Sequence, residues 1–250
     1  MDVKVAILIA FAGFLTGAIN TVSAAGSLVS LPALMFAGLP IELANGTNRI
    51  AIAIQCFTAF RSLKSVSTSI DKFAYVLALA SLPGAILGAW FAVKIDPIIL
   101  NWTLRIVIII FIIITLINPL KNIQLQDLKF SKSQKVIGII LFFFIGIYGG
   151  FIQAGTGFFI MSALLIVFKF PILQTNYIKA IAMLIYTLGT LFVFGGNNMI
   201  HWQYGLLLSA GGAVGAWFAG KWSLKATTNQ IRIAIALVLV IMSIKLWFFS

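Results

Sequence analysis

The stretch GFLTGAINTVSAAGSLVSLP, residues 13–32, decides the fold of this chain. It begins as an apolar helix, and Asn20, Ser23 and Ser27 then bring small polar groups into a run that is otherwise hydrocarbon. A second interruption of this kind, GIYGGFIQAGTG, occupies residues 146–157. Two broken helices at matching places in the two halves of a membrane protein are typical of a transport site where the breaks meet.

The composition indicates a membrane protein. Of the 250 residues, 62% are hydrophobic and only 9% are charged. A soluble domain of this size could not hide so much apolar surface, and several apolar runs approach the roughly 18 residues of a spanning helix. We therefore expect an all-α, multi-pass protein of the cell (inner) membrane, surrounded by the lipid bilayer. The single cysteine, Cys56, excludes an intramolecular disulfide and a cysteine-cluster metal site.

The charge is strongly basic, with a formal net charge of +12 from 17 Lys and Arg against 5 acidic residues. In a soluble protein this balance would indicate nucleic-acid binding. Here the basic residues lie mostly at helix ends, where they set the topology and meet anionic lipid. We therefore expect no nucleic-acid partner.

An internal repeat organises the chain. GAWFAVK at residues 88–94 returns as GAWFAGK at residues 215–221, and Arg105 and Arg232 keep the same spacing. This pattern predicts two similar halves, each with a broken or short helix pair and three full transmembrane helices, about 8–10 membrane segments in all. The predicted parts are a first transmembrane repeat at residues 1–120, a cytoplasmic linker at 121–134 and a second transmembrane repeat at 135–250. The helices expected are 5–22, a short segment from the break at 23–27 to 37, 43–60, 73–93 and 98–117, then 135–152, a break at 153–157, 158–168, 175–194, 202–222 and 231–249.

The basic residues predict the orientation. If each broken pair returns to the side on which it started, the two repeats are inverted and most basic residues fall on one side. Those residues are Arg61, Lys64, Lys72, Lys121, Lys129, Lys132, Lys135, Lys169, Lys221 and Lys225, against Lys4, Lys94 and Lys245 on the other side. If the broken pair crossed once instead, Lys169, Lys221 and Lys225 would join Lys94 outside. We therefore predict an inverted repeat with both termini outside and basic loops in the cytoplasm.

The order of the motifs resembles a known family. The first half carries Gly-x3-Gly, the small and polar residues of the break, Gly38-Leu39-Pro40 and Ala44-Asn45-Gly46-Thr47-Asn48. The second half carries Lys179-Ala180, LFVFGG, IHWQYGLLLSAGGAVGAWFAGK and a closing helix that contains an arginine. Over nearly the whole chain this order is similar to the sulfite exporter TauE/SafE family of membrane permeases.

This resemblance implies export or uptake of small sulfur-containing anions, such as sulfite, thiosulfate or organosulfonates. The chain departs from the family pattern at Ala24 and Ala25, where glycines are common. It also has Gln153 and Thr156 in the second break, which is usually rich in glycine. The departures bear on which substrate is carried.

The breaks themselves favour an anion. A broken helix exposes backbone N–H groups at the start of its second segment, with the positive end of the helix dipole pointing inward. We expect those starts at Gly26-Ser27 and Gly157-Phe158. The alternative is that the small residues only allow close helix packing. The candidate substrate-binding residues of the breaks are Asn20, Ser23, Gly26, Ser27, Gln153, Gly155, Thr156 and Gly157.

Charged residues inside two helices add to this site. A central arginine or lysine costs about 2.5 to 3.5 kcal/mol on insertion scales, so it normally has a partner or a function. The alternative for Arg49 and Lys179 is snorkelling, since both lie within about two turns of a helix start. The further candidate substrate-binding residues are Asn45, Thr47, Asn48 and Arg49 in one helix and Asn176 and Lys179 in the equivalent helix.

No residues of the sequence support catalysis, a cofactor or a metal site, and no carboxylate lies in mid-span. We therefore expect a transporter of a small anionic substrate that works by alternating access and is not an enzyme. Any proton coupling would use the protonation of the substrate itself. The alternatives are a transporter of another small anion or polar solute, or a non-transporting membrane partner protein. A homodimer is a further expectation.

Overall fold

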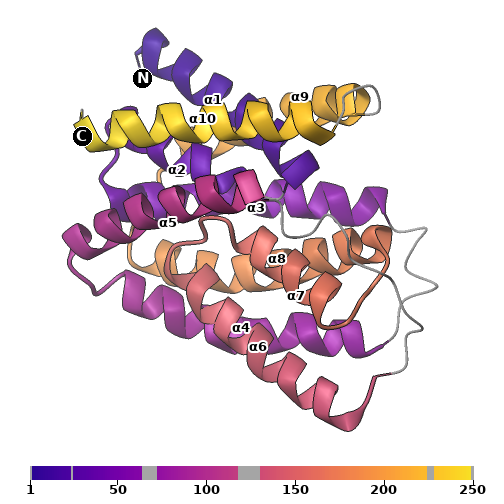
Figure 1. Cartoon of the computed structure of the whole chain (residues 1–250). Coiled ribbons are helices and arrows are strands. Elements are labelled where there is room, and N and C mark those ends of the chain that lie inside the picture. Colours follow the sequence, from indigo (N-terminus) through magenta and orange to yellow (C-terminus); the bar gives the residue numbers. More distant parts are fainter. Residues whose placement is uncertain (1, 24, 64–71, 118–129, 224–227, 249–250) are drawn as a thin grey trace.

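The computed structural model describes residues 2–23, 25–63, 72–117, 130–223 and 228–248. All regular secondary structure in these residues is helical (Figure 1), which confirms the predicted all-α class. The helices are α1 (Val3–Ser23), α2 (Ser27–Phe36), α3 (Ile41–Ser62), α4 (Phe73–Ala92), α5 (Pro97–Ile117), α6 (Lys132–Phe151), α7 (Thr156–Ile166), α8 (Ile172–Gly196), α9 (Trp202–Ser223) and α10 (Thr228–Phe248).

Two short helices follow two long ones. With 10 and 11 residues, α2 and α7 are too short to cross a bilayer alone. Each is followed by a tight turn that contains a residue with positive φ, Gly38 or Lys169. The turn after α2 lies beside the start of α5, whereas Phe168, after α7, packs on Phe73 at the start of α4.

The second break differs from the prediction. The chain leaves helical geometry at Ile152 and resumes it at Thr156, so α7 begins two residues before the predicted Gly157-Phe158 start. Gly155 has φ +70°, a left-handed conformation that glycine adopts without strain. This glycine turns the chain into α7, and Gly157 lies in the first turn of the helix.

Glycines join the two halves of the chain. A Cβ atom on Gly17 of α1 would collide with the carbonyl oxygen of Gly212 in α9, and one on Gly150 of α6 would collide with that of Ala85 in α4. Small residues let helix backbones approach this closely. The pairs α1–α9 and α4–α6 therefore each combine one helix from each predicted repeat. In the predicted repeat α1 corresponds to α6 and α4 corresponds to α9, so the two pairs are equivalent. The inverted relation of the repeats stays a prediction.

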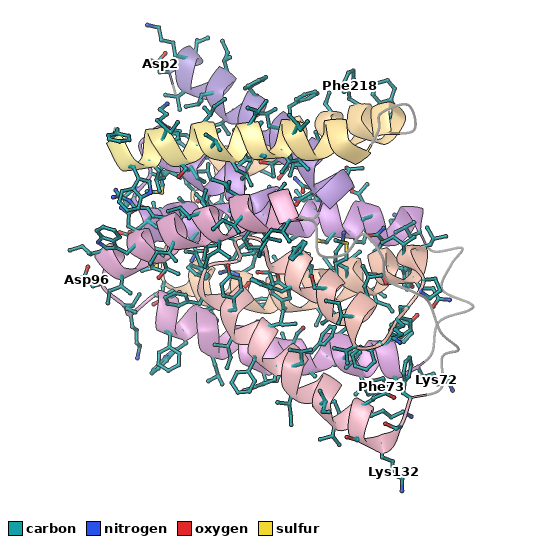
Figure 2. All side chains as sticks on the ribbon, viewed as in Figure 1. Asp2, Lys72, Phe73, Asp96, Lys132 and Phe218 are labelled. Atoms are coloured by element: carbon teal, nitrogen blue, oxygen red, sulfur yellow. The ribbon has the colours of Figure 1, made fainter. Side chains whose placement is uncertain are left out.

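The outer surface suits a lipid environment. Five helices of the described part are long and apolar enough to span a membrane, namely Val3–Thr21, Phe73–Ala92, Pro97–Thr115, Lys132–Phe151 and Ile172–Gly196. Large apolar side chains point outward from them, for example Phe192 with 82% of its surface exposed. Asp2 and Asp96 lie at the end that also carries both termini, and Lys72 and Lys132 lie at the opposite end (Figures 1 and 2). The chain is thus a multi-pass membrane protein.

Part of the predicted cytoplasmic linker can be compared with the structure. Residues 118–129 lie outside the described part, as do Lys64 and Lys225. Helix α6 begins at Lys132, inside the predicted linker, because Ser131 and Gln134 cap its first turn reciprocally. The helix thus begins three residues before the predicted helix 135–152, whereas the division into a linker and two repeats stays a prediction.

Candidate functional site

The two helix breaks meet in the middle of the protein through one serine. The Ser27 hydroxyl, at the start of α2, donates to the backbone carbonyl of Gln153 (3.1 Å) and accepts from the N–H of Gly155 (3.0 Å). Ser27 is 3% exposed and Gln153 is fully buried. A single hydroxyl group therefore links residues that are more than half of the chain apart.

The first break is closed by an amide side chain. Asn20, near the end of α1, accepts from the N–H of Gly26 through Oδ1 (2.7 Å) and donates through Nδ2 to Oε1 of Gln55 in α3 (2.7 Å). A Cβ atom on Gly26 would collide with the Thr16 carbonyl oxygen and crowd Asn20, so only glycine fits there. The side chain of Ser23 lies outside the described part.

Backbone N–H groups contribute less to the site than the breaks suggested. The N–H groups of Gly26 and Gly155 already donate to Asn20 and Ser27. That of Thr156 donates to the Gln153 carbonyl (3.3 Å). Because the chain itself satisfies these donors, an anion would compete for them or depend on side chains instead.

Side chains of the second break carry unused polar atoms. Gln153 has φ +55°, and its Nε2 donates to Thr187 of α8 (2.8 Å). Its Oε1 and the Oγ1 of Thr156 are buried without a hydrogen-bond partner in the described residues. Thr156 and Tyr186 of α8 both face Gly149, where a Cβ atom would lie 2.8 Å from the Thr156 methyl group and 3.3 Å from Tyr186 Cζ.

Arg49 points into this cluster from α3 and is fully buried. Its Nη1 donates to the Gly149 carbonyl (3.2 Å) and to Thr190 Oγ1 (2.8 Å), and its Nη2 donates to the Gly150 carbonyl (2.6 Å). Those carbonyls lie in the last turn of α6, where the helix dipole is negative and favours a cation. Snorkelling is thus the wrong interpretation for Arg49.

Two asparagines on α3 flank the arginine. Asn45 donates to the Phe151 carbonyl at the end of α6 (2.7 Å) and accepts from Arg49 (3.3 Å). Asn48 accepts from the Ser30 hydroxyl of α2 (2.5 Å), and its Nδ2 is buried without a partner in the described residues. Helix α3 therefore contacts both broken pairs. Asn45, Asn48 and Arg49 can do this together because residues three and four positions apart lie on one face of a helix.

Three predicted residues lie away from the breaks. Thr47 accepts from the N–H of His201 in the turn between α8 and α9 (2.8 Å). Lys179 donates to Asn176 within α8 (3.1 Å), and both lie beside α3 in the half of α8 nearer to the basic end. Lys179 precedes Thr187 by eight residues, about 12 Å along the helix axis.

The sequence prediction missed several polar residues that join the cluster. The mid-helix residues of α8 are detectable in retrospect, because polar side chains interrupt a helix that is otherwise apolar. The missed residues are Ser30, Gln55, Tyr186, Thr187 and Thr190.

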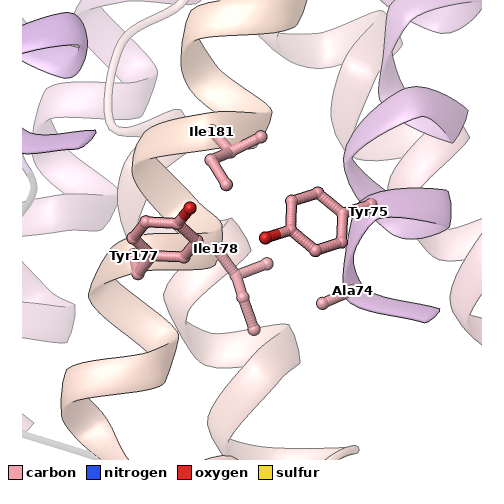
Figure 3. A pocket seen from close by; sticks show the side chains of 5 residues that line it. All are labelled: Ala74, Tyr75, Tyr177, Ile178 and Ile181. Carbon is pink, nitrogen blue, oxygen red and sulfur yellow. The ribbon is translucent and has the colours of Figure 1, made fainter. Parts of the chain in front are cut away.

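Two hollows of the surface lie elsewhere. A crevice between α4 and α8, bordered by Tyr75 and Tyr177, has no room for a water molecule (Figure 3). A larger cavity of about 500 Å³ lies between the turn after α2 and the start of α5. Arg49 and the break residues Gln153 and Thr156 have no exposed surface, so the structure represents a conformation closed around them.

Comparison with known proteins gives consistent matches. The family model described as "Sulfite exporter TauE/SafE" matches residues 9–246. A "Probable membrane transporter protein" of Haemophilus influenzae is 26% identical over 235 residues, 94% of this chain and 91% of the relative. "Probable membrane transporter protein ORF9" of Sinorhizobium sp is 25% identical over 94% of this chain and 89% of the relative. "Probable membrane transporter protein YfcA" of Escherichia coli K12 is 24% identical over 96% and 88%. No solved structure matches the chain.

Proposed function

Because the chain belongs to the sulfite exporter TauE/SafE family, we propose that it carries a small sulfur-containing anion, such as sulfite, thiosulfate or an organosulfonate. The protein is a membrane transporter and not an enzyme, as its family and its relatives are. The proposed binding site is the cluster in which the two breaks meet. Its residues are Ser27, Asn48, Arg49, Gln153, Thr156 and Tyr186.

The observation that carries the proposal is the set of donors left unused around Arg49. Arg49 Nε and Asn48 Nδ2 are buried without an acceptor in the described residues, and the Thr156 hydroxyl lies next to the Tyr186 hydroxyl. Each such group costs about 1–3 kcal/mol when it stays unsatisfied. An oxyanion has several acceptor oxygens, so it would satisfy these donors together.

The charges around the cluster also suit an anion. Arg49 supplies a full positive charge, and Glu42, the closest acidic residue along α3, precedes it by seven positions, about 10 Å of helix. Charge-assisted hydrogen bonds from a guanidinium group to an oxyanion are about twice as strong as neutral ones. A cation would meet only one carbonyl-type acceptor, Gln153 Oε1, without a partner here.

The contacts suggest how alternating access would operate. The glycine-packed pairs α1–α9 and α4–α6 have backbone contacts that leave little room for sliding. The Ser27 bridge, in contrast, consists of two hydrogen bonds between the broken pairs. We propose that the bridge breaks when the site opens toward either end and reforms around a bound anion.

Flux measurements in proteoliposomes test this function. Sulfite, thiosulfate, sulfoacetate and sulfate would be compared on a gradient, with Ser27→Ala, whose side chain differs by one oxygen atom. We expect saturable flux of one of the sulfur anions and a loss of at least about tenfold in the variant, because both bridging bonds disappear. Thr103→Val is the matched control, since its hydroxyl donates to the Ile99 carbonyl of its own helix, α5.

Other outcomes would contradict the proposal. Folded protein that moves none of these anions would favour another small anion or polar solute. Normal flux in Ser27→Ala would place the transport path away from the breaks. The expected homodimer also stays a prediction, which the mass of the protein in detergent measures.

A further inference from the structure

A second feature of the described part is a cavity at the far end of α2, away from the helix breaks. It measures about 500 Å³ and lies where the end of α2, the start of α3 and the start of α5 come together. This is the end of the molecule that carries both termini (Figure 1). Its size is within the usual range for small-molecule sites, about 300–1,000 Å³.

The walls combine apolar side chains with two oxygen-bearing groups. Phe36, Leu39 and Pro97 contribute apolar surface, and Glu42 and Asn101 contribute the oxygens. Glu42 Oε2 and Asn101 Oδ1 are buried and have no hydrogen-bond partner in the described residues. The negative charge of the Glu42 carboxylate at this wall favours a ligand that carries positive charge and donates hydrogen bonds.

Helix ends do not reverse this preference. The first turns of α3 and α5 bring positive dipole ends to the cavity, but Glu42 lies in one of them and Asp96 caps the other by accepting from Ile98 N–H (2.8 Å). A full negative charge outweighs the partial charge of about one half at a helix end. Glu42 and Asp96 therefore outweigh the partial charges of these two helix ends.

The same walls narrow the type of cation. Hard metal ions take about six to eight oxygen ligands, whereas only two side chains of the wall offer oxygens here. An ammonium group needs only a few acceptors, and the apolar walls would bury its hydrocarbon part. Phe36 already holds one ammonium group in this way, since Lys245 Nζ lies 4.2 Å from its ring centroid.

We propose that this cavity binds a small organic ammonium ion, with its nitrogen at Glu42 and Asn101 and its carbon chain against the apolar walls. Lys245 is not part of the cavity wall, although its ammonium group lies near the ring of Phe36, which is. Glu42 precedes Arg49 on the same helix, so an occupied cavity would lie at one end of the helix that carries the proposed anion site.

Calorimetric titration of the full chain in nanodiscs tests this proposal. Ethyl-, butyl- and hexylammonium would be compared with hexanoate and with Na⁺. We expect the affinity for the alkylammonium ions to rise by about fourfold for each methylene group that is buried. Hexanoate should bind at least about tenfold more weakly than hexylammonium, because the Glu42 carboxylate repels it. Na⁺ should also bind at least about tenfold more weakly, because the wall offers it too few oxygen ligands.

Two variants should change the affinity in opposite directions. Glu42→Gln should weaken hexylammonium binding at least about tenfold, because the charge is lost without a change of shape. Lys245→Met should strengthen it, since a positive charge near Phe36, which would repel an ammonium ligand, is removed. Asn101→Leu should weaken binding as well and replaces Glu42→Gln if that variant does not fold.

Several results would overturn the proposal. These are an unchanged affinity for hexylammonium in Glu42→Gln and Asn101→Leu, or binding of hexanoate or Na⁺ that is as tight as that of hexylammonium. An affinity for alkylammonium ions that does not depend on chain length would overturn it as well. Ser27→Ala should leave ammonium binding unchanged. Failure at this cavity is therefore distinguishable from failure of the anion site.

Discussion

Arg49 is held by neutral groups alone in the described part of the chain. Two backbone carbonyls of α6, one threonine and one asparagine accept its hydrogen bonds, and Phe194 lies 4.4 Å from its guanidinium carbon. The partial negative charge at the end of α6 stabilises the cation, but it does not neutralise it. Arg49 thus keeps a buried positive charge and one donor, Nε, without a partner in the described residues, as the proposed anion site requires.

Replacement of Arg49 separates its charge from its hydrogen bonds. Arg49→Lys keeps the charge but cannot donate to several acceptors in the same planar arrangement. We expect Arg49→Gln to weaken anion binding at least about tenfold and Arg49→Lys to weaken it less. Calorimetric titration of the transported anion measures both. Equal affinity of Arg49→Gln and the parent protein would exclude Arg49 from the anion site.

Gly149 tests the contact between α6 and the second break. A Cβ atom there would lie 2.8 Å from the Thr156 methyl group, so Gly149→Ala must displace Thr156 or α8. We expect a loss of flux of at least about tenfold and a modest loss of stability, about 1–3 kcal/mol. Gly196→Ala, where no atom lies within 4 Å of the new Cβ, is the control and should retain flux. Full flux in Gly149→Ala would show that Thr156 is not needed.

At the scale of elements, the four-residue spacing of glycines determines which helices pair. Gly13 and Gly17 of α1 contact α9, and Gly146 and Gly150 of α6 contact α4. The packing alternative raised for small residues is therefore right for these glycines. The residues of the breaks behave differently, because Gly26 and Gly155 adjoin side-chain hydrogen bonds that close the chain around the site.

The two glycine-packed pairs should respond alike to mutation. Gly17→Ala and Gly150→Ala each place a methyl group against a backbone carbonyl oxygen, which cannot move away as a side chain can. We expect each to lower the thermal midpoint through at least about 1–3 kcal/mol of overpacking. Gly195→Ala, whose nearest neighbour would be 3.7 Å away, should not. A loss in one pair only would argue against equivalent roles of the two pairs.

At the scale of the whole molecule, the charged ends define a topology that can be measured. Lys132 and Asn198 are exposed at opposite ends of the molecule, and Cys56 is buried, so a cysteine-free parent is accessible through Cys56→Ala. In that parent we expect Asn198→Cys to react with an impermeant maleimide in intact cells. Lys132→Cys should react only after permeabilisation, because basic ends stay in the cytoplasm. The reverse pattern would invert the predicted orientation.

The candidate site was predictable in part. Ser27, Gln153 and Arg49 stood out because a polar group or a charge in an apolar run is costly wherever it lies. Thr187 and Thr190 did not, because a threonine can bond to its own helix and needs no distant partner. Thr47 was assigned to the site from its neighbours in sequence, yet its hydroxyl bonds to the turn before α9.

The sequence by itself determined the membrane class, the all-helical fold, the places of the breaks and the family. All of these follow from local composition, spacing and motif order, which do not depend on distant contacts. Only the tertiary structure decided that Ser27 bridges both breaks, that Arg49 binds the end of α6 and that α1 pairs with α9. These contacts join residues at least 100 positions apart, and they depend on the packing of whole helices rather than on any local pattern.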